Sequence, residues 1–299
     1  MTTIWRLNIK TAANKGVNPR KFCLDKNILG IGWRISKSGV TSWNDYISEA
    51  SDKYKKYGRK FSAAINAIKH RMKIGDLCWT RDHDGIYYIG RINGDWSYVD
   101  DFDHLAADVV NIRSCSWHKV GTVDVVPGKI VNSYISGSTV QQVCGGDIKN
   151  YSQYLINKLS GNKLYLTEKS TNNIINLISS EDCEDLVALY MQKECGYICI
   201  PSSCKSDTAV YEYVMKHHIS GEKAVAQVKH GDIDLNRDNY SSIGCKVFLF
   251  TTRGKYIGNE NKNIICLNPD DMIDFAKKNY PILPDRIQHW LDFEKNQNK

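Results

Sequence analysis

The 299-residue sequence contains no apolar run approaching the about 20 residues that a membrane-spanning helix requires. Its N-terminal stretch, MTTIWRLNIK, lacks the apolar core of a signal peptide. No internal repeat or low-complexity tract is visible. With 42% hydrophobic and 24% charged residues, the composition is that of a folded globular protein rather than a disordered one. We therefore expect a cytoplasmic protein with no membrane partner, long enough for two domains.

The ten cysteines include no paired C-x-x-C motif. The closest group is Cys195, Cys199 and Cys204, and Cys115 with His118 forms another weak pair. Structural zinc sites normally show tighter paired spacing, and a disulfide scaffold is typical of small secreted chains. The cysteines are therefore expected to be reduced thiols, most of them buried.

Two short strands are predicted in the second half of the chain, at residues 210–215 and 223–229, joined by a tight turn. Alternation along the second strand places Gln227 and Lys229 on one face. Glu212 lies on the neighbouring strand. Carboxylate and amide oxygens can hold a hard divalent cation, and a nearby ammonium group can orient a water and offset charge on a phosphate. This is the layout that a metal-dependent nuclease needs.

An acid-led helix precedes these strands in SSEDCEDLVALYMQKECGYICIP, and it is followed by Gly196 and an apolar strand. In this order, the helix, the acidic strand and the QVK strand resemble the PD-(D/E)xK nuclease superfamily, nearest to its Mrr-like restriction endonuclease branch. The resemblance implies that Glu184, Glu212 and Gln227 bind Mg²⁺ or Mn²⁺ and that Lys229 completes the catalytic set.

Two residues depart from the superfamily's common pattern. The second acid is Glu212 where Asp is commoner, and Gln227 is a neutral and weaker metal ligand. Asp207 is the rival for the second acid, but it falls in a predicted loop rather than on the strand. A Gln-x-Lys at the end of a strand is by itself usually a solvated edge, so the prediction depends on the whole arrangement.

Basic charge is concentrated in the first half of the chain. Residues 1–150 hold 22 Lys and Arg against 14 Asp and Glu, a net charge of +8, while the remainder carries −1. The run from Lys53 to Lys73 contains eight basic residues and no acid. An ordinary surface helix usually mixes signs, so this run favours contact with a phosphate backbone. The candidate contacts are Lys55, Lys56, Arg59 and Lys60.

The sequence of the first half of the chain also predicts a small, strongly curved β-domain with attached helices. Residues 75–93 form the clearest hairpin, with an Asp-Gly turn between apolar strands. Apolar residues at helical spacing, including Phe61 and Ile65, predict helices within residues 43–72. Further strands are expected at residues 1–10, 109–118 and 121–125.

Six of the seven tryptophans lie in this half. Trp79, on a predicted strand, is expected in the core, whereas Trp33 and Trp96 follow glycine turns that would present their rings at a rim. The order GIGW, helices, GDLCWT and YYIGRI resembles the PUA-like superfamily, in particular its EVE and YTH-type branch, over about residues 1–135. The resemblance implies an aromatic pocket that holds an extruded, often methylated, base. Trp33 matches the loop tryptophan, and Trp96 and Trp117 are candidate walls, although core positions for all three are an alternative.

A glycine- and serine-rich stretch marks the domain boundary near Gly145 and Gly146. The predicted domains are therefore a PUA-like reader at residues 1–146 and an Mrr-like nuclease at residues 147–299, an α+β domain followed by an α/β domain with a central mixed sheet. Helices are expected at residues 151–159, 171–179, 269–278 and 284–294, with a strand at 246–251.

The predicted function is a modification-dependent, type IV-like restriction endonuclease that acts on foreign DNA. An RNA-cleaving enzyme of the same architecture, or a binding protein with an inactive nuclease domain, are the alternatives. The sequence leaves open the modified base, the cleavage position and the oligomeric state, for which a homodimer is one candidate.

Overall fold

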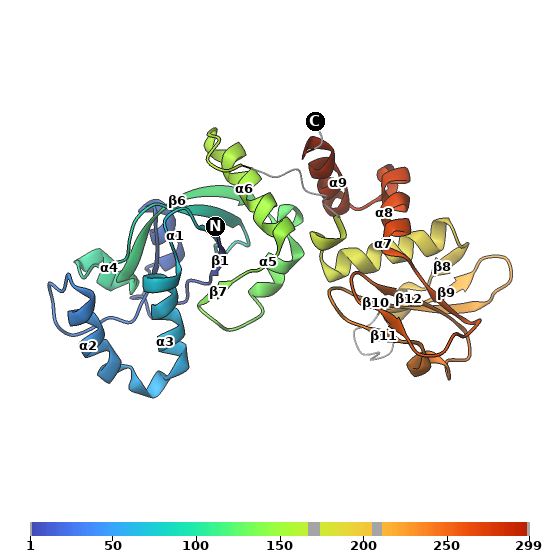
Figure 1. Cartoon of the computed structure of the whole chain (residues 1–299), viewed down its shortest axis with the longest axis horizontal. Helices are drawn as coiled ribbons and strands as arrows, with labels where there is room; N and C mark the ends of the chain where they lie inside the picture. Colours follow the sequence, from blue (N-terminus) through green and yellow to red (C-terminus); the bar gives the residue numbers. More distant parts are fainter. Residues whose placement is uncertain (1, 167–173, 205–210, 298–299) are drawn as a thin grey trace. The chain divides into compact units, whose positions relative to one another are not determined.

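The computed structural model describes residues 2–166, 174–204 and 211–297. By its internal contacts the chain divides into two compact units, unit 1 at Met1–Ser170 and unit 2 at Thr171–Lys299. Both combine helices with sheets, which confirms the mixed α and β class (Figure 1).

Unit 1 is built on a curled, half-barrel sheet of seven strands in the order β2-β6-β4-β3-β1-β7, with β5 paired to β6. Neighbouring strands along this order are antiparallel, except that β1 and β3 are parallel. The long strand β6 pairs with β2, β4 and β5, which lets the sheet curl on itself. The strands are β1 (Ile4–Leu7), β2 (Ile28–Ile31), β3 (Leu77–Arg81), β4 (Tyr87–Ile92), β5 (Ser97–Tyr98), β6 (Asn111–Gly121) and β7 (Val140–Gln142).

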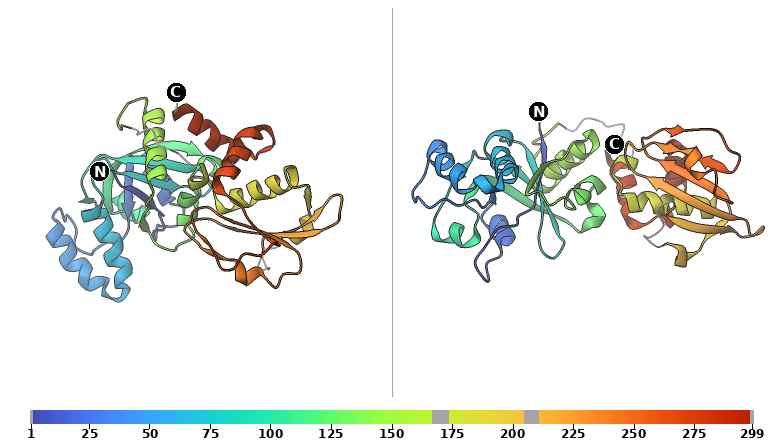
Figure 2. Two further views of the ribbon diagram at one scale, coloured as in Figure 1. Left: turned by 45° about the vertical axis from the view of Figure 1, so that its right-hand side comes forward. Right: turned by 90° about the horizontal axis from the view of Figure 1, so that it is seen from below.

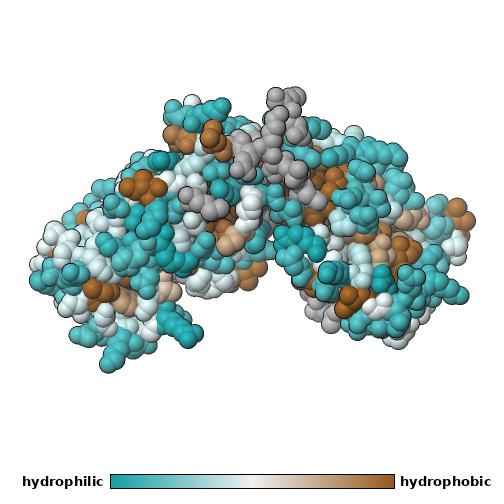
Figure 3. Space-filling model, in the orientation of Figure 1, coloured by the Kyte–Doolittle hydropathy of each residue, from teal (hydrophilic) through white to brown (hydrophobic). Residues whose placement is uncertain are grey.

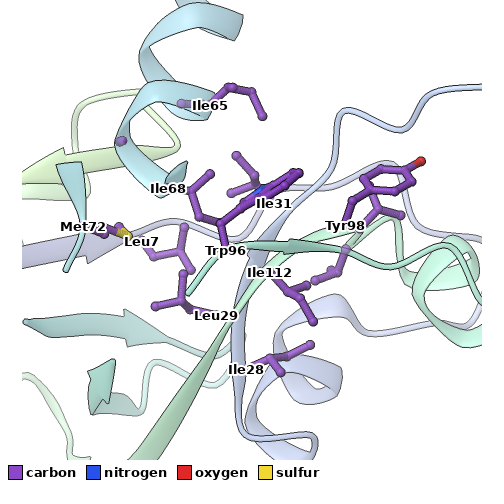
Figure 4. Close-up of a cluster of buried hydrophobic side chains, with 14 of the residues drawn as sticks. Leu7, Ile28, Leu29, Ile31, Ile65, Ile68, Met72, Trp96, Tyr98 and Ile112 are labelled. Carbon is purple, nitrogen blue, oxygen red and sulfur yellow. The ribbon is translucent and has the colours of Figure 1, made fainter. Parts of the chain in front are cut away.

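Helices border this sheet and close its core. Phe61, Ile65 and Ile68 are buried against the strands, as their helical spacing predicts, and Figure 4 shows Ile65 and Ile68 in one cluster with Leu29 and Trp96. The helices are α1 (Pro19–Asp25), α2 (Trp43–Lys53), α3 (Arg59–Asn66), α4 (Phe102–Ala107), α5 (Gly128–Ser133) and α6 (Gly146–Ser160), with 3-10 turns η1 (Lys55–Tyr57) and η3 (Val123–Val125) and a π-helical turn η2 (Ala67–Arg71).

Most elements expected in unit 1 are confirmed, including the hairpin of β3 and β4, where Gly85 has a φ of +79° in the turn. Trp79 is fully buried, as predicted. The prediction of a strand at residues 121–125 is wrong. The chain leaves β6 at Gly121, whose φ is +144°, and forms the 3-10 turn η3 instead.

Helix α6 begins at the predicted domain boundary but packs against β1, β4 and β6 of unit 1. The indole Nε1 of Trp79 donates to Oγ of Ser152 at 3.0 Å, and Tyr151 donates to the carbonyl of Val125 at 2.7 Å. The buried face of this helix therefore belongs to the first core. The division between the units accordingly follows α6, whereas the predicted boundary at Gly145 and Gly146 precedes it.

Unit 2 contains a mixed five-stranded sheet in the order β14-β12-β10-β9-β8. β10, β12 and β14 are parallel, whereas β9 and β8 continue the sheet in antiparallel pairing. The strands are β8 (Tyr197–Cys199), β9 (Tyr213–His217), β10 (Lys223–Lys229), β12 (Lys246–Thr251) and β14 (Ile264–Cys266), and a separate parallel pair joins β11 (Leu235–Asn236) to β13 (Tyr256–Ile257).

The helices of unit 2 are α7 (Ser180–Lys193), α8 (Pro269–Lys278) and α9 (Asp285–Gln297), with 3-10 turns η4 (Ile174–Asn176), η5 (Pro201–Ser203), η6 (Arg237–Tyr240) and η7 (Tyr280–Ile282). Helix α7 lies along one face of the sheet and contacts β8, β10 and α8 (Figures 1 and 2). The helices predicted at residues 269–278 and 284–294 and the strand at 246–251 are confirmed. The helix predicted at residues 171–179 is reduced to η4 among its described residues.

Hydrophilic residues cover most of the face in Figure 3, and hydrophobic residues occur there in scattered groups. All ten cysteines are free, and four of them are buried: Cys23, Cys78, Cys115 and Cys183. The prediction that most of the cysteines are buried is therefore wrong.

Candidate functional site

Gln227 and Glu212 meet at one end of the β9–β10 hairpin. The antiparallel register pairs Ala226 with Tyr213, and the amide N–H of Glu212 donates to the carbonyl of Ala226 at 2.8 Å. Gln227 is the next residue of β10, and Glu212 comes just before β9 rather than on the strand as predicted, so the two side chains lie close together. The side-chain Nε2 of Gln227 donates to Oε1 of Glu212 at 2.6 Å. The structure thus brings together an amide and a carboxylate that are fifteen residues apart in sequence.

Lys229 joins this pair from the end of β10. Its Nζ lies 3.5 Å from Oε1 of Glu212, the same oxygen that accepts from Gln227. Gln227 is buried, whereas 39% of the Lys229 side chain and 25% of the Glu212 side chain are exposed. An ammonium held by a carboxylate but still open to solvent can contact an anion that approaches from outside. The alternation along β10 therefore places Gln227 and Lys229 beside Glu212. These three residues form a polar corner, in which the accessible cation is Lys229.

Glu184 approaches this corner from helix α7. The hydroxyl of Tyr213, the residue after Glu212, donates to the main-chain oxygen of Glu184 at 3.2 Å. The pKa of Glu184 is raised from 4.5 to about 7, first by burial and next by the negative charge of Glu212, while the positive charge of Lys229 acts in the opposite direction. These interactions make Glu184, Glu212 and Lys229 one electrostatic unit.

The first turn of α7, just before Glu184, is fixed at two points. Ser179 and Asp182 form a reciprocal capping box, with hydrogen bonds of 3.0 and 2.9 Å. The carboxylate of Asp182 is also paired with Nε of Arg286 from α9 at 3.0 Å. A buried, doubly held helix start limits the movement of the neighbouring Glu184.

The remaining acid candidate, Asp207, lies outside the described residues. Within the described ranges, no group of three or more His, Cys, Asp or Glu side chains is placed to hold a metal ion. The corner itself presents two such side chains, Glu184 and Glu212, and its third oxygen donor is the amide of Gln227.

In unit 1, Trp33 occupies a strained loop after β2. Its φ is +71°, a conformation that residues other than glycine rarely adopt. Tyr46 donates to the carbonyl of Trp33 at 2.9 Å, and Asn111 donates to the carbonyl of Gly32 at 2.6 Å. A Cβ on Gly32 would lie 2.6 Å from a carboxylate oxygen of Asp108 and 3.1 Å from its main-chain oxygen, so a larger residue there would displace Asp108. These hydrogen bonds and this close approach hold the main chain of the loop in place.

The half-buried ring of Trp33 forms one wall of a hollow of about 300 Å³. Tyr54 and Tyr57 approach it edge to face, with centroid distances of 5.0 and 5.3 Å. Asp108 lines the same hollow, and burial raises the pKa of its carboxyl group. Aromatic walls with one carboxylate acceptor can enclose a flat ring that carries N–H donors.

Of the three predicted aromatic walls, only Trp33 reaches this hollow. Trp96 is 7% exposed and donates from Nε1 to Asn111 at 3.1 Å within the core (Figure 4), so its predicted position at a rim is wrong. Trp117 is half-buried, donates to the carbonyl of Ile28 at 2.8 Å and lines a different hollow together with Tyr88. The three rings therefore do not form one cage.

The four candidate phosphate contacts are all exposed on η1 and α3, and within the described part of the chain none of them pairs with a carboxylate. Nζ of Lys56 lies 5.2 Å from the ring centroid of Tyr57, which lines the hollow at Trp33. The basic run therefore borders the aromatic hollow within the same unit.

If the basic run contacts DNA, as the sequence predicts, neutralising Lys55, Lys56, Arg59 and Lys60 to Gln should weaken DNA binding and flatten its salt dependence. Each phosphate contact contributes about −0.9 to the slope of log K against log salt concentration, because counterions are released. Binding titrations over a range of salt concentrations measure the slope. Lys119→Gln, an exposed change elsewhere in unit 1, is the matched control. An unchanged slope in the fourfold variant would mean that these four residues do not contact DNA phosphates.

The sequence-based prediction missed Tyr54, Tyr57 and Asp108. The two tyrosines were visible as aromatic residues interleaved with the basic run in KYKKYGRK, a pattern that suits nucleic-acid contact. Asp108 gave no local signal in the sequence. Its position at the hollow depends on its left-handed backbone, with a φ of +50°, directly after α4.

The comparisons with known proteins bear on unit 1. Residues 5–143 match the family described as "Domain of unknown function (DUF8426)". This match ends just after β7, so it includes the hollow at Trp33 and the basic run but not the corner at Glu212. No curated protein and no solved structure matches the chain. Among the described residues, no helix combines the length and apolar character that crossing a membrane requires.

Proposed function

We propose that this protein is a metal-dependent endonuclease that cleaves DNA after reading a modified base, in the manner of a type IV-like restriction enzyme acting on foreign DNA. In this proposal unit 1 is a PUA-like reader and unit 2 a restriction-endonuclease-like domain of the Mrr type. One observation carries the proposal: Glu212, Gln227 and Lys229 converge at the end of a mixed sheet, beside the half-buried Glu184 of α7.

The donor set fits a hard divalent cation such as Mg²⁺ or Mn²⁺. Glu184 and Glu212 offer carboxylate oxygens and Gln227 an amide oxygen, which are the ligand types that Mg²⁺ prefers. The negative charge of Glu212 raises the pKa of Glu184, which means that the two carboxylates repel each other. A cation bound between them would offset this repulsion. When bound, such an ion lowers the pKa of a coordinated water and neutralises charge on the phosphate.

Lys229 would act on the same phosphate. Its ammonium is held at Glu212 and is open to solvent, so it can orient the attacking water and stabilise the charge that develops on the phosphate oxygens. Gln227 is buried and takes its position from the strand, so it would fix the orientation of Glu212 as well as offer an oxygen.

Base reading is assigned to the hollow at Trp33. Stacking on its indole would hold an extruded base, and the carboxylate of Asp108 could accept a hydrogen bond from the base edge. The exposed cations of η1 and α3 would hold the flanking phosphates, which position the DNA without reading it.

Binding of Mg²⁺ should depend on pH through Glu184. Because its pKa in the folded protein is about 7, this carboxyl group must lose a proton to bind the ion at lower pH. The apparent affinity should therefore be constant above pH 7 and fall about tenfold per pH unit below it. Calorimetry at pH 6 and pH 8, in buffers of different ionisation enthalpy, measures both affinity and proton release. Proton release is expected at pH 6 and not at pH 8.

Glu184→Gln should weaken Mg²⁺ binding and abolish its pH dependence, whereas Glu194→Gln, at the far end of α7, should change neither.

The stability of the metal-free protein gives an independent readout. A raised carboxyl pKa means that the folded protein retains a proton between pH 4.5 and about 7, so this group's contribution to stability falls as pH rises through that window. Glu184→Gln should therefore raise the melting temperature more at pH 8 than at pH 4.5. Wild-type behaviour of Glu184→Gln in both measurements would remove Glu184 from the site.

Nucleic-acid binding without cleavage is a second candidate, favoured by the neutral side chain of Gln227. Its NH₂ group already donates to Glu212 and so satisfies one oxygen that a cation would otherwise contact. The same calorimetry separates the two candidates: DNA binding with no Mg²⁺ binding at pH 8 would favour the second.

A further inference from the structure

Two thiols face each other at one end of β8 in unit 2. The Sγ atoms of Cys199 and Cys204 are 3.7 Å apart, and both cysteines are free. Cys199 ends the edge strand β8 and is half-buried, whereas Cys204 follows the 3-10 turn η5 and is exposed. Neither residue has a part in the proposed metal site or the base-reading hollow.

The turn between the two cysteines is held by hydrogen bonds to the neighbouring strand. The hydroxyl of Ser203 donates to the carbonyl of Ile200 at 2.6 Å and accepts from the amide of Val214 on β9 at 2.8 Å. The amide of Ile200 donates to the carbonyl of Val214 at 3.0 Å. The turn is thus fixed at both ends, which keeps the thiols facing each other.

The separation is close to that of a bonded pair. A disulfide has an S–S distance of about 2.05 Å, so the sulfur atoms at 3.7 Å need to approach by roughly 1.7 Å. Rotation about the side-chain bonds of the exposed Cys204 can supply such a movement. The loop closed would be very short, so the bond would add little stability by restricting the unfolded chain and should be readily reduced.

We infer that Cys199 and Cys204 form a reversible oxidation site that closes to a disulfide when the protein meets a hydroperoxide. The exposed thiol of Cys204 attacks the peroxide oxygen, giving a sulfenic acid and releasing an alcohol, or water in the case of hydrogen peroxide. The sulfur of Cys199 then attacks Sγ of Cys204, the S–O bond breaks and water leaves. In sum, two thiols lose two electrons and two protons, and one hydroperoxide is reduced.

The two cysteines differ in a way that suits these roles. The pKa of Cys199 is raised to about 11, chiefly by burial and then by the neighbouring Cys204, so Cys199 is a protonated thiol at neutral pH and the exposed Cys204 is the residue that meets the peroxide first. The resulting disulfide would tighten a turn that Ser203 ties to β9, the strand that follows Glu212.

Mass spectrometry of the full-length protein tests this chemistry without reference to nuclease activity. The reduced protein is treated with hydrogen peroxide, its remaining thiols are alkylated, and the tryptic peptide of residues 194–205 is weighed; it contains Cys195, Cys199 and Cys204. Oxidation should remove two of the three alkylation sites and two hydrogens, and dithiothreitol should restore all three sites.

Two variants identify the bonded pair. Cys204→Ser should lose the disulfide, whereas Cys195→Ser should keep it and leave no alkylation site in the peptide after oxidation. Retention of all three sites in oxidised wild-type protein, or direct conversion of the thiols to sulfinic and sulfonic acids, would overturn the inference. Loss of the disulfide in Cys195→Ser would also overturn it, because the bond would then join a different pair.

Discussion

Lys229→Ala should abolish detectable DNA cleavage while leaving DNA affinity within a few-fold of the wild-type value. Loss of a group that stabilises charge in the transition state typically costs about 10²–10³ in rate. The phosphate contacts that we propose for unit 1 do not involve this lysine, so equilibrium binding should survive. Cleavage rates and binding constants measured on the same preparation separate the two effects.

A matched control lies on the same strand. Lys223→Ala removes an exposed lysine from the opposite end of β10 and should leave both cleavage and binding unchanged. The melting temperature of each variant shows whether it is folded. Cleavage that persists in folded Lys229→Ala protein, at the rate of the Lys223→Ala control, would refute the catalytic assignment.

Trp33→Ala should remove the preference for modified over unmodified DNA and leave salt-dependent background binding intact. Stacking of a base on an aromatic ring is worth about 1 to 3 kcal/mol, and the ring is half-buried at the wall of an open hollow. If Trp33 were purely a core residue, truncation would instead cost roughly 3 to 5 kcal/mol of stability. Competition binding and thermal unfolding of one variant measure both quantities.

The backbone at this position allows a second variant. Trp33→Gly also removes the ring but relieves the positive φ, so it should unfold at a higher temperature than Trp33→Ala while showing the same loss of discrimination. Trp117→Ala, which alters a different hollow, should keep the preference. A folded Trp33 variant that discriminates normally would exclude this residue from base reading.

Elements whose local pattern agreed with their tertiary surroundings were predicted well. The strand at residues 223–229 and the helix at 269–278 have the predicted bounds, because alternation and an Asn-Pro helix start are local signals. The same alternation correctly aligned Gln227 with Lys229. Glu212 could be paired with them because the hairpin register follows from the turn between the strands.

The failures concern contacts between distant segments. The glycine turn before Trp96 suggested exposure, but Asn111, fifteen residues away, accepts its N–H and the ring enters the core. The Gly-Gly pair before α6 suggested a linker, but Trp79 and Ser152, 73 residues apart, join that helix to unit 1. Neither partner could be chosen from local sequence, because burial depends on the arrangement of the whole sheet.

Incubation of the full-length protein with Mg²⁺ and pairs of DNA duplexes of identical sequence tests modification-dependent cleavage most directly. Each pair has one unmodified duplex and one duplex that carries either methylated cytosine or methylated adenine. The duplexes are compared with and without a chelator, and with Lys229→Ala protein in parallel. We predict that the wild-type protein cuts a modified duplex only, that the chelator stops the reaction and that the variant cuts neither duplex. Equal cutting of both duplexes, or intact modified DNA in the presence of Mg²⁺ for both methylated bases, would contradict the account.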